Sequence, residues 1–151
     1  MKRLIVFIFI VILLCLTNLT ITKDLTFDKI FANSKVEIFF DRKTDLEYQK
    51  IQNGVGEIVF CEANQLSDIL KNDNKVSGFT IKIKNENVDE VLKKLNVKNV
   101  YDKNFGIYGW SNLLGEVVNL KLDMFGSYVN FQCVNNEDGI ILGCPIILGS
   151  Y

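Results

Sequence analysis

An unbroken apolar run over residues 4–16 constrains this chain more than any other feature, because it divides the sequence into two unlike parts. The run follows Lys2 and Arg3, and no acidic residue occurs before Asp24. A basic start, an apolar stretch of this size and a polar continuation are typical of a secretory signal. Residues 1–22 are therefore predicted to direct export, with the N-terminus held inside by its two cations.

The fate of this segment is left open by its sequence. The small residues that mark a cleavage site are missing around residues 16–22. Counting Leu19 and Ile21, the stretch reaches about 17 residues, the lower limit for a spanning helix, so an uncleaved signal-anchor is an alternative to cleavage. Lipidation at Cys15 and burial as a helix of a cytoplasmic domain are two further interpretations. The expected location is outside the cytoplasm, either anchored in the membrane and facing outward or secreted.

Residues 23–151 are predicted to form one extracytoplasmic domain, since about 130 residues without a linker is an ordinary domain length. Apolar and polar residues alternate over 36–40 and 79–83, which indicates half-buried strands. Further strands are expected at 57–61 and near 97–101, 106–110, 117–123, 128–134 and 140–148.

Two segments carry apolar residues at three- and four-residue spacing, which predicts short helices over 64–71 and 88–95. Asn87 followed by Glu90 predicts a capping box at the start of the second helix. The predicted fold class is α+β: an antiparallel or mixed twisted sheet with two or three short helices on one face. The hydrophobic signal or anchor helix precedes this domain.

The C-terminal strands are predicted to form a hairpin, because Asp138-Gly139 is a strong signal for a two-residue turn. Folding at this turn places Cys133 opposite Cys144 and puts Phe131, Val129, Ile146 and Leu148 on one face. Pro145 lacks an N–H group, which predicts that the last strand lies at an edge of the sheet.

This predicted edge strand is apolar on both faces, because Ile141 and Ile147 point away from the core side. An exposed apolar edge must be covered by another part of the chain or by another protein. The C-terminal strand is therefore the expected contact for an unidentified protein partner. Tyr108 and Trp110, in an aromatic cluster between residues 101 and 110, are candidate members of a binding surface, although core packing is the more ordinary use of such residues.

Three cysteines remain in the exported part, namely Cys61, Cys133 and Cys144. Outside the cytoplasm a disulfide between Cys133 and Cys144 is a candidate, and the alternative is that both are small buried hydrophobes. The chain has no histidine, which removes the commonest metal ligand and the commonest general base. No metal site and no cofactor is expected.

The charge balance argues against nucleic acid as a partner. The whole chain has a net charge of −1, and without residues 1–22 it keeps 15 of its 17 basic residues and all 18 acidic ones, a net charge of −3. Binding to the phosphate backbone requires a basic surface instead. A membrane contact is expected only through the N-terminal segment, if it stays attached.

Carboxylates offer a weak catalytic alternative. Asp41 with Asp45, or Asp89 with Glu90, could act as paired acid and base, but turns and helix starts explain such residues by capping and solvation. The expected function is a non-enzymatic interaction or structural module of the cell envelope. A secreted enzyme that uses carboxylates or a lone cysteine is the alternative.

One family resemblance bears on this expectation. Gly109-Trp110-Ser111, then 128–132 (YVNFQ) and the ending 142–151 (LGCPIILGSY), resemble the C-terminal pattern of YwmB-like exported proteins of Firmicutes. The resemblance covers about the last third of the chain. It implies a fold similar to the TATA-box-binding protein, without DNA binding, and an envelope or sporulation-associated role. Trp110 stands where the pattern has Tyr, both cysteines stand where it has small residues, and the chain is shorter than the family, with one unit where the family has two.

Overall fold

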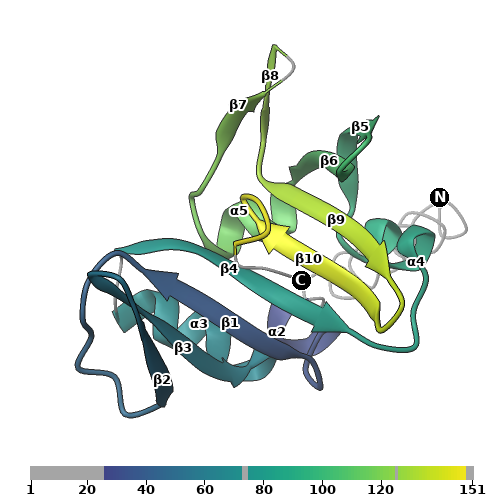
Figure 1. Cartoon of the computed structure of the whole chain (residues 1–151). Coiled ribbons are helices and arrows are strands. Elements are labelled where there is room, and N and C mark those ends of the chain that lie inside the picture. The colour runs from purple at the N-terminus through teal and green to yellow at the C-terminus, as the bar shows by residue number, and fades with distance from the viewer. Residues whose placement is uncertain (1–25, 73–74, 125, 149–151) are drawn as a thin grey trace, which may run out of the picture.

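The computed structural model describes residues 26–72, 75–124 and 126–148 of the chain (Figure 1). The predicted signal or anchor segment, residues 1–22, lies outside this part. Among the described residues no helix has the length and apolar character needed to cross a membrane.

An antiparallel sheet of eight strands dominates the molecule, in the order β2-β3-β1-β4-β10-β9-β6-β5. Its strands are β1 (Lys35–Phe40), β2 (Gln49–Asn53), β3 (Gly56–Glu62), β4 (Val76–Ile83), β5 (Val97–Lys103), β6 (Gly106–Ser111), β9 (Phe131–Asn136) and β10 (Gly139–Cys144). A separate ribbon of β7 (Leu122–Met124) and β8 (Ser127–Val129) projects from the sheet (Figure 1). The described helices are α2 (Phe27–Ile30), α3 (Ala63–Asn72), α4 (Val88–Lys94) and α5 (Asn112–Val117).

All four of these helices pack on one face of the sheet, which we call the inner face. Alternate strand residues such as Ile38, Phe79 and Leu142 are fully buried there against helix residues such as Leu66 and Leu114. The period of two in the strands and the apolar stripes on the helices produce this single core. The predicted α+β class is confirmed, with a purely antiparallel large sheet.

The sheet consists of two halves joined at one place. Strands β2, β3, β1 and β4 come from the first part of the chain, β10, β9, β6 and β5 from the second, and only the pairing of β4 with β10 joins them in the sheet. Each half ends in an edge hairpin whose second strand runs directly into a helix, at Glu62–Ala63 in one half and Ser111–Asn112 in the other.

The capping box predicted for α4 is confirmed. The Asn87 side chain accepts a hydrogen bond from the Glu90 amide at 2.9 Å, and the Asn87 amide donates to the Glu90 carboxylate at 3.2 Å. These reciprocal bonds satisfy two backbone donors that would otherwise be unpaired at the helix start.

The hairpin of β9 and β10 exists, but its predicted register is wrong by two residues. The turn residues are Glu137 and Asp138, so that Cys133 lies opposite Leu142 and not opposite Cys144. Gly139 has a φ of +129° and already belongs to β10, where an added Cβ would lie 2.5 Å from the Ile83 carbonyl oxygen. This glycine is needed for the close approach of β4 as well as for the turn, which local turn rules do not reveal.

The prediction that the last strand is an edge is also wrong, because β10 lies between β4 and β9. Pro145 follows the last residue of β10. Its missing N–H therefore ends the row of hydrogen bonds and does not make β10 an edge strand. Ile146, Ile147 and Leu148 therefore do not continue the strand, and the expected pairing with Phe131 does not form.

The segment 145–148 instead folds back over the outer face of the sheet, opposite the helices. A Cβ added to Gly143 would collide with the backbone of Ile146 and Ile147, and one added to Gly78 would lie 2.8 Å from the Leu148 side chain. The Thr80 hydroxyl lies 3.4 Å from both the amide nitrogen and the carbonyl oxygen of Leu148. Glycines in two central strands thus leave room for the chain to cross the sheet.

Two further elements differ from expectation. The strand expected over 117–123 does not form as such, because Val117 ends helix α5, residues 118–121 have no regular structure, and only residues 122 and 123 belong to the short strand β7. Helix α5 begins early because the Ser111 hydroxyl accepts a hydrogen bond from the Leu114 amide at 3.3 Å, which caps it. Strand β2 was not predicted, since all five of its residues are exposed and give no alternating pattern.

Candidate functional site

The four residues expected to form a binding surface lie in two separate places. Ile141 and Ile147 line one depression on the outer face. Tyr108 is buried beside that depression, with its hydroxyl held by Gln132. Trp110 lies elsewhere, in a cleft beside the β7–β8 ribbon.

The depression that contains Ile141 and Ile147 has a volume of about 700 Å³, and we call it the outer-face depression. Its lining combines apolar residues and glycine with four amides and contains no charged residue: Asn104, Phe105, Gly106, Gln132, Val134, Asn135, Asn136, Ile141 and Ile147. Phe105, in the turn between β5 and β6, is 78% exposed. A large exposed aromatic ring beside half-buried aliphatic side chains is the usual composition of an interaction site.

Gln132 fixes the walls of this depression. Its side-chain amide donates to the Phe105 carbonyl at 2.8 Å and to the Tyr108 hydroxyl at 3.0 Å. Its side-chain carbonyl accepts from the Ile147 amide at 3.0 Å. One side chain therefore connects the β5–β6 turn, strand β6 and the returning C-terminal segment. The predicted strand 128–134 contains two amides, Asn130 and Gln132, among apolar residues, and nothing in that pattern indicates the contacts of Gln132.

The cysteines are free thiols in this structure, and the register separates Cys133 from Cys144 across the hairpin. Burial raises the pKa of Cys133 to about 11 and that of Cys61 to about 12, and it raises the pKa of Cys144 further. A protonated thiol is a poor nucleophile, so burial makes these groups act as small hydrophobes at neutral pH.

The paired carboxylates considered as catalytic groups have other roles or surroundings. Glu90 is used in the capping box of α4, and Asp89 lies exposed in the same first turn. Asp41 and Asp45 are both exposed in the loop between β1 and β2. None of these four lies in the outer-face depression.

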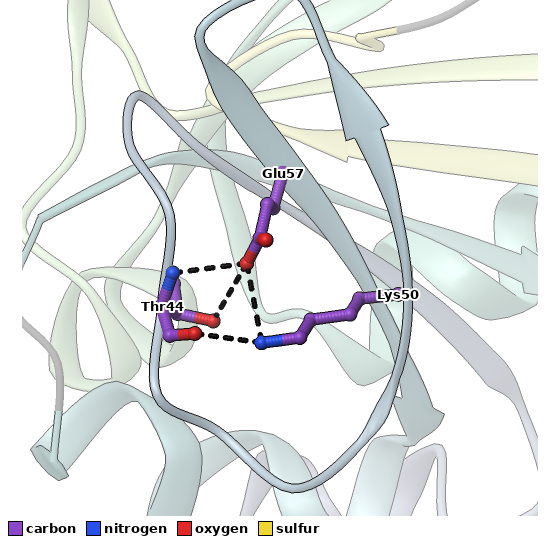
Figure 2. A network of polar contacts seen from close by, with 3 residues as sticks. All are labelled: Thr44, Lys50 and Glu57. Carbon is purple, nitrogen blue, oxygen red and sulfur yellow. Dashed lines mark hydrogen bonds and ion pairs between the residues drawn. The ribbon is translucent and has the colours of Figure 1, made fainter.

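A different carboxylate, Glu57 on β3, organises that loop (Figure 2). It accepts hydrogen bonds from the Thr44 amide at 2.9 Å and the Thr44 hydroxyl at 3.2 Å. The Lys50 ammonium lies 3.4 Å from the same carboxylate oxygen and donates to the Thr44 carbonyl at 2.6 Å. The bond from the Thr44 backbone is the main cause that lowers the pKa of Glu57, and Lys50 adds to it. We call this network the loop latch.

A second network, fully buried, lies at the other end of the sheet and joins Ser111 to Asn130. The Asn130 side chain accepts from the Ser111 amide at 2.8 Å and donates to the Ser111 carbonyl at 2.7 Å, as a neighbouring strand would. The Ser111 hydroxyl donates to the Leu95 carbonyl at 2.6 Å. We call this the amide staple, and it positions the end of β6 and the start of α5.

The described part of the chain contains no group of three or more cysteine and acidic residues able to hold a metal ion. Comparison with protein-family models, with curated proteins and with solved structures finds no match to this chain. The outer-face depression and the cleft at Trp110 contain the residues expected to bind a partner.

Proposed function

We propose that this protein is a non-enzymatic interaction module of the cell envelope that holds an extended segment of a protein partner in the outer-face depression. The observation that carries this proposal is the exposed ring of Phe105 beside Ile147 and Val134, with amides and no charged side chain around the depression. An uncharged segment with one apolar anchor residue suits this lining, because apolar side chains can pack on Phe105 and Ile147 while backbone groups of the segment bond the amides.

The contact differs from the one expected from the sequence. An edge strand would recruit a partner through backbone hydrogen bonds, but β10 is internal, and its backbone is occupied by β4 and β9 on its two sides. The proposed contact is therefore made by side chains on a face of the sheet. Of the two isoleucines expected as anchors, the half-buried Ile147 keeps that role in the proposal, whereas Ile141 is only 3% exposed and lines the depression.

Site-specific crosslinking tests this function. A photoreactive residue at position 105 is expected to give a discrete adduct in cells, whereas the same residue at position 55 is not. Val55 is a matched control because it is 87% exposed and apolar but lies in the β2–β3 turn, far along the sheet. Adducts of equal yield at both positions, or none at position 105, would contradict the proposal.

The envelope location is a separate part of the proposal. It is supported by the basic and apolar N-terminal sequence and agrees with the role implied by the YwmB-like resemblance. A reporter fused after Tyr151 that is active only outside the cytoplasm is the expected result. A reporter at the same position that is active in the cytoplasm would contradict the envelope location. The proposed binding of a partner in the outer-face depression would still be tested by the crosslinking experiment.

A further inference from the structure

The projecting β7–β8 ribbon encloses a second concave site, which the proposed protein contact does not use. A cleft of about 410 Å³ lies between this ribbon and the β5–β6 edge hairpin, and it is lined by Asn99, Trp110, Lys121, Ser127 and Tyr128. Its volume falls in the range of about 300–1,000 Å³ that is usual for small-molecule sites. We call it the ribbon cleft.

Its aromatic side chains are placed for contact with a ligand and not for core packing. Tyr128 is 56% exposed, and Trp110 is half-buried. The Trp110 indole N–H donates to the Asn112 side chain at 2.9 Å, which fixes the orientation of the ring. A fixed aromatic ring at the wall of a cleft offers a flat apolar surface for another ring.

The cleft also carries one positive charge. The Lys121 ammonium lies 4.3 Å from the centre of the Tyr128 ring, a cation–π contact that holds the charge at the cleft. Among the described residues no carboxylate forms an ion pair with Lys121. An anionic group of a ligand can therefore pair with this ammonium without displacing a partner of opposite charge.

The backbone beside the cleft is unsuitable for adding a peptide strand. Asn99 has a φ of +54°, and the pairing of β5 with β6 shifts register between Lys98 and Tyr101. Such an irregularity interrupts the regular row of donors and acceptors that a peptide strand would need. The exposed Asn99 side chain is instead available to bond hydroxyl groups.

We infer that the ribbon cleft binds an acidic sugar, a pyranose ring that carries a carboxylate, either free or within a polysaccharide. The apolar face of the ring packs on Trp110, the carboxylate pairs with Lys121, and the amide of Asn99 and the hydroxyl of Ser127 bond the ring hydroxyls. Tyr128 acts as a positioning residue because it holds Lys121.

The fluorescence of Trp110 reports on this cleft alone, since it is the only tryptophan of the chain. The full chain in a neutral detergent is titrated with galacturonic acid, with trigalacturonate, and with the methyl ester of each. A saturable change with the acids, and affinity about tenfold weaker for the esters, is the expected result. Tighter binding of the trimer than of the monomer would identify a polysaccharide as the source, and equal binding a free sugar.

Variants separate the roles of the side chains. Lys121→Met is expected to remove the preference for acid over ester, whereas Lys121→Arg is expected to keep it. Asn99→Gly, which suits the left-handed backbone at this position, is expected to weaken the binding of both acid and ester severalfold. Lys71→Met is the charge control, because the Lys71 side chain is exposed on α3, the helix that follows β3 in the first half of the chain. Equal binding of acid and ester, no saturable change with any sugar, or tighter binding of a short aspartate peptide would each overturn the inference.

Discussion

In the half built by β2, β3, β1 and β4, the loop beside the edge hairpin is held by a carboxylate and an ammonium, whereas the other half uses a neutral amide. The loop latch at Glu57 is partly open to water, with the Lys50 side chain 31% exposed. The amide staple at Asn130 is completely buried. Both networks perform a similar task, which is to fix the chain where regular pairing ends.

The difference shows how surroundings decide the strength of a polar contact. In the latch, water competes for both charged groups, so breaking it lets each one be hydrated again. In the staple, removal of the amide leaves the Ser111 N–H and C=O groups buried without partners, which costs about 1–3 kcal/mol for each group. The neutral network should therefore contribute more to stability than the charged one.

The largest effect is expected where the two halves meet. The Leu142 side chain belongs to the core on the inner face and is fully buried, and the residue lies opposite Ile81 of β4 and Cys133 of β9. Leu142→Ala should lower the free energy of unfolding by about 2–5 kcal/mol, because it leaves a cavity at the junction. Urea unfolding followed by circular dichroism measures this. Two separate transitions in the variant would show that the halves fold independently.

The staple should come second. Asn130→Ala is expected to destabilise by about 2–4 kcal/mol, because it leaves backbone groups of Ser111 unpaired in the core. Asn135→Ala is the matched control, since Asn135 is an exposed amide on β9, the strand that begins directly after Asn130. The same urea titration measures both variants. A loss of stability in Asn130→Ala as small as that in the control would mean that water takes over the hydrogen bonds of the Asn130 side chain.

A smaller effect is expected at Gln132, which belongs to the second half but lies partly exposed. Gln132→Ala should cost about 1 kcal/mol and release the segment 145–148 from the outer face. Hydrogen exchange at the Ile147 amide is the direct measurement, because this amide donates to the Gln132 side chain. Unchanged protection of that amide would show that Thr80 and the glycines hold the segment without Gln132.

The smallest effect is expected at the latch, and it should depend on pH. Because the pKa of Glu57 is lowered from 4.5 on folding, its contribution is present above that value and is lost as the pH falls below it. The protection factor of the Thr44 amide, which corrects for the pH dependence of exchange in an unfolded peptide, should therefore fall as the pH drops below 4.5 in the unmodified chain. Glu57→Gln should remove this dependence, and added salt should weaken the latch but not the staple. A pH dependence that persists in the variant would assign it to another carboxylate.

Much of the fold was accessible from the sequence because local patterns determine it. The alternation over 79–83, the apolar stripe over 64–71 and the capping box at Asn87 each depend on neighbouring residues, and each element is present. The register of the last hairpin was not accessible. It depends on the contact between Gly139 and Ile83, two residues far apart in the chain.

The candidate site also depends partly on local spacing and partly on contacts between residues far apart in the chain. Ile141 and Ile147 were assigned to one surface because of their spacing, and they do line one depression, although Ile147 reaches it after the strand has ended. Trp110 and Tyr128 meet only because the β7–β8 ribbon projects beside β6, which no local pattern predicts. The segments that resemble the YwmB-like pattern contain side chains that hold parts of the fold together by hydrogen bonds, namely Ser111, Asn130 and Gln132.

The junction of β4 with β10 also matters for the order in which the chain leaves the ribosome. Strand β4 is complete at Ile83, whereas its partner begins only at Gly139. Because N-terminal segments emerge first, the edge of β4, with Phe79 and Ile81 on its apolar face, stays unpaired until the final strand arrives. An unpaired apolar edge joins readily with another such edge. A chain halted before residue 139 is therefore expected to bind chaperones, and the folding of this protein depends on completing its last strand.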